Sequence, residues 1–152
     1  MDKQDRILIG RSDVLDLPEL DLQGIEAKVD TGARTSAINC HDVEEVEIDG
    51  VKKIFFNILD PEHPQFNEKR LSTKNYSKRI VKNSFGDSEE RYVIKTIVEF
   101  FGSQFETEFT LSNRNNLKFP ILLGRRLLAK RFVVDVAKKN VWLKQQELEQ
   151  KK

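Results

Sequence analysis

Short apolar segments separated by turn residues run along most of the chain and predict a protein built mainly of β-strands. In several segments, apolar and polar positions alternate with the two-residue period of a strand that buries one face. Ile25, Ala27 and Val29 share one face of such a segment, whereas Glu26 and Lys28 lie on the other. The segments with a strand pattern are 6–10, 24–29, 43–48, 53–59, 91–99, 105–111, 119–123, 132–136 and 141–143.

Two local signals refine this pattern. Asp49-Gly50 separates two of the strand segments, and an Asp-Gly pair between strands is a strong indication of a β-hairpin. One helix is predicted over 125–131, directly after Gly124, because Leu127, Leu128 and Arg131 fall at helical spacing. We therefore expect an all-β fold with one short C-terminal helix.

The middle of the chain, 60–87, breaks the strand pattern. It has few apolar residues and holds two of the four prolines. A segment of this length without a packing pattern is either a solvated loop or a flexible cover over a cleft, and both readings stay open. It also carries a run of basic residues, namely Lys69, Arg70, Lys74, Lys78, Arg79 and Lys82.

Composition narrows the class of protein. A chain of 152 residues suits one domain, expected over 1–152 with an ordered core at about 6–144 and a polar tail at 145–152. Because 26 Lys and Arg offset 25 Asp and Glu, no global charge favours nucleic acid or lipid. The single cysteine, Cys40, excludes an internal disulfide framework. No apolar run suits a membrane span or a signal peptide, so we expect a cytoplasmic protein.

The strongest candidate for chemistry is Asp30-Thr31-Gly32, which follows the half-buried strand 24–29. A carboxylate at the end of such a strand loses hydration, and hydrogen bonds from main-chain N–H groups would compensate for this loss. Gly32 permits the tight turn that directs those groups at Asp30, and the Thr31 hydroxyl can pin the turn. Alone, the tripeptide is also explained by an ordinary Asx turn.

A second segment makes the pattern specific. The apolar strand 119–123 leads into Gly124, Arg125 and the predicted helix. With the Asp-Thr-Gly-Ala turn earlier in the chain, this layout resembles a retropepsin-type aspartic peptidase. More narrowly, the chain is similar to the bacterial group labelled ATP-dependent zinc proteases, which is associated with ATP-grasp ligases of the ribosomal-protein-modifying type. The stretch 27–37, Ala-Lys-Val-Asp-Thr-Gly-Ala-Arg-Thr-Ser-Ala, carries most of this resemblance, whereas Asn39 stands where relatives commonly have histidine.

The resemblance implies a closed or partly open retropepsin-like barrel and a site that two copies of the chain build together. Aspartic peptidases need two adjacent carboxyl groups that share one proton, and this chain has one Asp-Thr-Gly. Asp30 from each chain of a homodimer would therefore form the catalytic pair, which Thr31 and Gly32 position. The hairpin 78–91 would close over a peptide or protein substrate as a flap.

The remaining site residues follow from the same resemblance. Ala33 and Arg34 would contact substrate beside the catalytic turn, and Arg34 would be a candidate partner for a substrate carboxylate. Ser84, Phe85 and Gly86 would contact it from the flap tip. Gly124 and Arg125 are assigned structural roles.

Two other functions remain open. The first is a non-catalytic peptide-binding or protein-binding module on the same fold, which uses the basic stretches 69–82 and 125–131 to dock an acidic partner of an ATP-grasp ligase system. The second, weaker one is a zinc protease. Cys40 and His41 are adjacent and point to opposite faces of a strand, and His63 lies in a Pro-rich loop, so we expect neither a metal nor another cofactor.

Overall fold

The structure is a computed structural model of the chain and describes residues 5–66, 68–82, 85–113 and 118–150. Strands make up most of the ordered elements, which confirms the expected mostly-β fold. In chain order, the elements are β1 (Ile7–Ile9), β2 (Ser12–Leu17), the 3-10 helix η2 (Pro18–Leu20), β3 (Leu22–Val29), β4 (Ser36–Ile48), β5 (Val51–Ile58), β6 (Leu71–Thr73), β7 (Tyr76–Lys82), β8 (Ser88–Phe100), β9 (Ser103–Ser112), β10 (Ile121–Leu123), α1 (Arg125–Leu128), β11 (Phe132–Val134) and α2 (Val141–Gln150).

The main sheet closes into a ring. Its strands follow the order β10, β3, β2, β8, β9 and β4, and β4 then pairs with β10 again. The short strand β10 lies parallel to β3, with Leu123 beside Val29, and antiparallel to β4, with Ile121 beside Ile38. The last strand of the ring therefore joins the two strands that flank the Asp30 turn.

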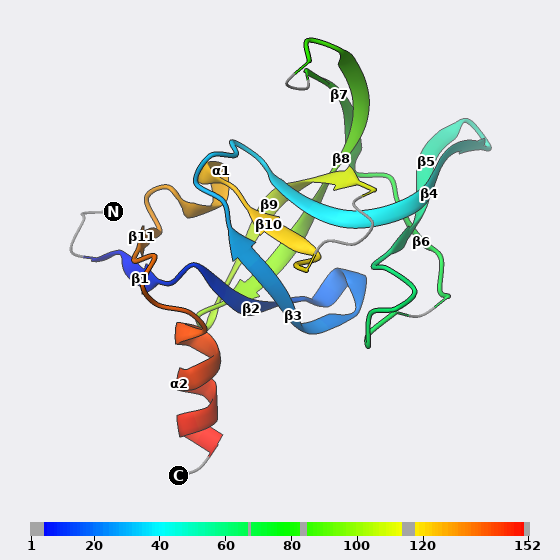
Figure 1. Cartoon of the computed structure of the whole chain (residues 1–152). Coiled ribbons are helices and arrows are strands. Elements are labelled where there is room, and N and C mark those ends of the chain that lie inside the picture. The colour runs from blue at the N-terminus through cyan, green and yellow to red at the C-terminus, as the bar shows by residue number, and fades with distance from the viewer. Residues whose placement is uncertain (1–4, 67, 83–84, 114–117, 151–152) are drawn as a thin grey trace.

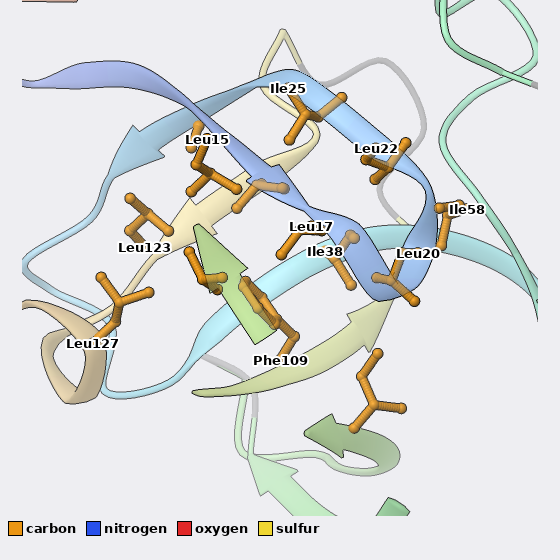
Figure 2. Close-up of a cluster of buried hydrophobic side chains, with 14 of the residues drawn as sticks. Leu15, Leu17, Leu20, Leu22, Ile25, Ile38, Ile58, Phe109, Leu123 and Leu127 are labelled. Atoms are coloured by element: carbon orange, nitrogen blue, oxygen red, sulfur yellow. The ribbon is translucent and has the colours of Figure 1, made fainter. Parts of the chain in front are cut away.

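The hydrophobic core fills the inside of this ring. Figure 2 shows aliphatic side chains from β2, β3, β4 and β10 packed around Phe109 of β9. Ile25 and Ala27 are completely buried, and Glu26 and Lys28 are exposed, as the alternation along 24–29 predicts. Burial of this one face fixes the register of β3, because a shift by one residue would turn Glu26 and Lys28 inward.

Two long hairpins extend from the ring, as Figure 1 shows. The β4–β5 hairpin turns at Asp49 and Gly50, both of which have positive φ (52° and 79°), so the predicted Asp-Gly hairpin is confirmed. The second hairpin consists of β7 and the first half of β8, with Lys78 opposite Tyr92 and Lys82 opposite Ser88.

The segment 60–87 contains more regular structure than its sequence indicates. β6 adds to the edge of β5, and β7 pairs along β8, so only part of the segment is a loop. Both are edge strands that pair on one side, and among their described side chains Leu71 and Tyr76 pack against the core. Hydrophobic alternation did not reveal them.

Three further expectations need correction. The segment 141–143, expected as a strand, is the first turn of α2, and residues 145–150 of the expected polar tail continue this helix. α1 is a single turn, Arg125–Leu128, shorter than the predicted 125–131. The strand β2 was missed because its alternation, Ser-Asp-Val-Leu-Asp-Leu, is irregular.

The C-terminal helix α2 stands away from the ring and is attached at its first turn (Figure 1). Both carboxylate oxygens of Asp13 in β2 accept hydrogen bonds there, from the N–H groups of Trp142 (2.8 Å) and Leu143 (3.1 Å). Asp13 thus caps the helix from a distant strand, although it is itself almost completely buried. In the described ranges, no helix has both the length and the apolar character that a membrane crossing needs.

Candidate functional site

Asp30 begins the turn that connects β3 to β4, at the edge of the ring. The turn is closed by a hydrogen bond from the N–H of Ala33 to the carbonyl oxygen of Asp30, at 3.2 Å. The N–H of Gly32 donates to Oδ1 of Asp30 at 3.1 Å, the interaction expected for the glycine of this motif. Asp30 is half-buried, so its carboxylate is held from one side and accessible from the other.

The end of β10 and the residues that follow it are hydrogen-bonded to the turn. The N–H of Asp30 donates to the carbonyl oxygen of Leu123 at 2.9 Å, which continues the β3–β10 pairing into the turn. The N–H groups of Arg125 and Arg126 then donate to the carbonyl oxygens of Ala33 (2.8 Å) and Arg34 (3.0 Å). Two segments about ninety residues apart therefore share one continuous set of backbone hydrogen bonds.

Gly124 lies at the closest approach of these two segments. A Cβ on Gly124 would lie 2.7 Å from the carbonyl carbon of Thr35, so no other residue fits there without movement of the backbone. The N–H of Gly124 donates to the buried hydroxyl of Ser36 at 3.0 Å. The sequence did not predict that Ser36 supports the site, because this role depends on a contact with a residue far away in the chain and no local pattern indicates it.

The arginines around the turn have different environments. Nη1 of Arg125 donates to the carbonyl oxygen of Thr31 at 3.1 Å, so this side chain braces the turn. Arg34 is exposed on the same turn, and Ala33 beside it is half-buried. Thr31 is exposed too, and its backbone carbonyl oxygen is the acceptor of the Arg125 hydrogen bond.

The proposed flap residues lie between β7 and β8. Phe85 is exposed over 89% of its surface, and Gly86 has a φ of +85°, which suits a tight turn at the tip of a hairpin. Ser84 lies outside the described residues.

A groove with a basic lining begins next to the Asp30 turn. Val29, the residue before Asp30, contributes to its wall together with Phe119. None of its cationic side chains forms an ion pair with a described residue. These cations are Arg11, Lys28, Lys118 and Lys139.

The candidate zinc ligands do not come together. Burial raises the pKa of Cys40 to about 12, which keeps the thiol protonated, and His41 stacks on Phe66. His63 lies 3.0 Å from Glu26 through Nε2, and its Nδ1 accepts a hydrogen bond from Gln65. Within the part of the chain that the structure describes, no group of three such donors gathers. These side chains do not fit a zinc centre.

No second carboxylate among the described residues is hydrogen-bonded to Asp30, whose side chain accepts a hydrogen bond from the N–H of Gly32. The other Asp turns lie elsewhere: Asp49 is at the tip of the β4–β5 hairpin, and Asp60 follows β5. A carboxylate pair would therefore need an Asp30 from another copy of the chain.

Comparison with known proteins places this geometry in a family. Two proteins named probable alpha-L-glutamate ligase, from Desulfotalea psychrophila and Shewanella pealeana, are 35% and 32% identical over 134 residues. Each match covers 86% of this chain but only 28% of the relative, so the chain spans little more than a quarter of their length.

A crystal structure of the Legionella pneumophila protein Lpg0085, of unknown function, has the same fold. Its TM-score is 0.70 at 20% identity, and the alignment covers 88% of this chain and 96% of that one. The family model of RimB-like proteins, with the description retropepsin-like aspartic endopeptidase RimB, matches residues 8–145. The chain therefore belongs to the RimB-like family of retropepsin-like proteins.

Proposed function

We propose that the protein is an aspartic-type endopeptidase or isopeptidase that acts as a homodimer, with one Asp30 from each chain. The observation that carries the proposal is the half-buried Asp30. Its carboxylate is held by the N–H of Gly32, and its backbone N–H is bonded to the carbonyl oxygen of Leu123. The family match supports this reading. A second copy, related by a twofold axis near Asp30, would complete the site.

The chemistry follows from two carboxyl groups in hydrogen-bond contact. Two like charges at such a distance cannot both ionise, so the pair shares one proton. The ionised Asp30 takes a proton from water, which attacks the scissile carbonyl, while the protonated Asp30 donates to the carbonyl oxygen. The first carboxyl group then gives its proton to the leaving nitrogen while the second takes one back from a hydroxyl of the intermediate, so the C–N bond breaks and the pair again holds one proton. The Gly32 N–H and the backbone bonds to the β10 segment hold each carboxylate in place during both steps.

The substrate that we propose is an acidic peptide segment. The exposed Arg34 and the cations of the groove beside Val29, which form no ion pair with a described residue, suit carboxylate groups on either side of the cleaved bond. The names of the ligase relatives point to the same chemistry, since a glutamate ligase handles an acidic amino acid. The β7–β8 hairpin, with Phe85 and Gly86 at its tip, would cover the bound peptide.

A second candidate is a non-catalytic module that binds an acidic partner of an ATP-grasp ligase system. The observation in its favour is that the chain matches only 28% of each ligase relative, as expected of a domain that serves a ligase. The basic stretches 69–82 and 125–131 would dock that partner. In either case we propose a cytoplasmic setting, which the lone buried thiol of Cys40 suits.

The test combines assembly with cleavage. We expect the purified protein to contain a dimer and to cleave a glutamate-rich peptide between about pH 3 and about pH 8. Asp30→Asn should abolish cleavage, while Asp49→Asn, in the exposed hairpin turn, should retain it. When the Asp30→Asn protein is mixed with wild type, the activity should fall by more than the dilution of wild-type chains alone explains. Wild-type chains that enter mixed dimers lose their partner carboxyl group and become inactive.

Three outcomes would contradict the peptidase. Full activity of a strict monomer would exclude a shared site. Salt-sensitive binding of the acidic peptide without cleavage at any pH would favour the binding module. Cleavage that survives Asp30→Asn but stops after chelation would favour a metal-dependent reaction.

A further inference from the structure

Glu108, in the middle of β9, joins two parts of the molecule that are separate in the chain. Its Oε2 atom accepts hydrogen bonds from Arg79 of β7 and from Arg126 of α1, the latter at 3.3 Å. We call these three side chains the Glu108 junction. β7 belongs to the β7–β8 hairpin, the proposed flap, and α1 follows the Gly124 segment that is bonded to the Asp30 turn, so the junction connects these two parts.

Each side of the junction is tied to its element by backbone contacts. The N–H of Arg126 donates to the carbonyl oxygen of Arg34 at 3.0 Å, within the Asp30 turn. Arg79 lies opposite Arg91 in the β7–β8 ladder, so its side chain moves with the hairpin. Phe109, next to Glu108, pairs with Ser36 just after the turn, so the carboxylate is carried by a strand beside the site.

The negative charge of Glu108 is needed to hold the two arginines of the junction close together. Two guanidinium groups share one oxygen of Glu108, and without that charge they would repel each other. The three side chains keep 23% (Glu108), 36% (Arg79) and 44% (Arg126) of their surface exposed, so solvent weakens each pair alone. A network with a shared acceptor nevertheless links its members, because loss of one changes the position of the others.

We propose that Glu108 is a positioning residue that couples the β7–β8 hairpin to the Asp30 turn. When the hairpin is in place, Arg79 holds Glu108, which in turn holds Arg126 and the turn beneath it. When the hairpin moves away, Arg126 loses an ordered acceptor and the turn becomes looser. The consequence for catalysis rests on the proposed function, but the coupling itself is a property of the fold.

Hydrogen–deuterium exchange tests the coupling without any need for activity. We expect Glu108→Gln to speed amide exchange about threefold or more both in β7 and at Arg125 and Arg126, because both anchors loosen together. Glu106→Gln is the matched control. Glu106 lies two residues away on the same face of β9, is exposed, and forms no ion pair with a described residue. Faster exchange in only one of the two regions would contradict the coupling.

A double-mutant comparison shows whether the effect passes through Glu108. Arg79→Gln, in the hairpin, should speed exchange at the Arg126 amide, although the two arginines are not bonded to each other. In a Glu108→Gln background, the same Arg79→Gln change should have no further effect on that amide. Additive effects in the double variant would mean that the two regions respond independently, and would overturn the proposal.

Kinetics then separate positioning from a general loss of structure. With a peptide that the wild type cleaves, Glu108→Gln should raise KM about fivefold with a smaller change in kcat, because a loosened hairpin loses more freedom on closure. Glu106→Gln should change neither. If the wild type cleaves nothing, the proposed function fails, and the exchange experiments still decide the coupling. A fall in kcat alone, with KM and exchange unchanged, would overturn the assignment of Glu108.

Discussion

Gly124 and Thr35 meet backbone to backbone: a Cβ on Gly124 would lie 2.7 Å from the Thr35 carbonyl carbon and 2.9 Å from its oxygen. Gly124→Ala should therefore lower the free energy of unfolding by about 1–3 kcal/mol, because the backbone must shift to relieve the overlap. Urea denaturation measures this loss. A stability equal to that of the wild type would show that the two segments separate easily.

A second glycine provides the control for this change. Gly50, at the tip of the β4–β5 hairpin, has open space around it, and its φ is +79°. Gly50→Ala should cost only about 1–2 kcal/mol of backbone strain. Since that hairpin tip and the Asp30 turn lie at opposite ends of the long strand β4, we expect Gly50→Ala to preserve peptide cleavage and Gly124→Ala to reduce it.

Asp13 is expected to decide whether α2 stays attached. Asp13→Ala removes the acceptor of the Trp142 and Leu143 N–H groups and should lower stability by about 1–2 kcal/mol. Trp142, the single tryptophan of the chain, packs against Phe101 and reports on the attachment by fluorescence. A red shift of its emission is expected for Asp13→Ala but not for Glu147→Ala on the exposed side of α2; an unchanged spectrum would contradict the cap.

The contact between Glu45 and Tyr76 should make the stability of the fold depend on pH in the alkaline range. The Tyr76 hydroxyl donates to Glu45 at 2.6 Å, and this bond raises the pKa of Tyr76 to about 12. Because the pKa is raised on folding, the stability that this group contributes is present below pH 10, the ordinary pKa of tyrosine, and is lost as pH rises towards 12. Ultraviolet titration of the phenolate should show one tyrosine that ionises late, and Tyr76→Phe should remove that step.

The pKa of Glu45, the acceptor in the same contact, is shifted in the opposite direction. Hydrogen bonds from Tyr76 and Lys78 lower the pKa of Glu45 below its ordinary 4.5. Its contribution is therefore present above that pH and is lost as pH falls through the lowered pKa. Glu45→Gln should bring the Tyr76 ionisation back towards the pH of an ordinary tyrosine. A late ionisation that persists in Glu45→Gln would show that another group causes it.

Cys40 is predicted to be unreactive in the folded protein. It is 2% exposed, and burial raises its pKa to about 12, so almost no thiolate exists at neutral pH. A thiol reagent at about pH 8 should modify it only in denaturant, at a rate that follows unfolding. Rapid modification of the native protein would mean that β4 opens around Cys40 without global unfolding.

Several features of the fold follow from local sequence alone. The alternation along 24–29 predicts the buried face of β3, because a strand between core and solvent needs a two-residue period. Asp49-Gly50 predicts its hairpin, because both residues must take positive φ in the tight turn. The Asp30-Thr31-Gly32 turn and the Gly124-Arg125 segment indicated the retropepsin-like layout, and the longer stretch 27–37 indicated the narrower family.

Other features depended on partners that local patterns do not contain. Val141-Trp142-Leu143 has the composition of a strand, yet it forms a helix because Asp13, far away in the sequence, caps its first turn. The hydrophobic pattern did not reveal β7, because polar side chains of this strand form ion pairs at the surface, such as that of Lys78 with Glu45; only the family resemblance implied a hairpin there, at 78–91. Propensity is a weak guide where one tertiary contact outweighs it.

The amino-acid sequence by itself therefore determined the mostly-β class, the buried face of β3 and the turn that presents Asp30, because these depend on neighbours in the chain. Only the tertiary structure decided how that turn is held. The insertion of β10 between β3 and β4, the contact of Gly124 with Thr35 and the Glu108 junction each join residues from segments that are separate in sequence. Such contacts arise when the ring closes around its core, and no periodicity in one segment can specify them.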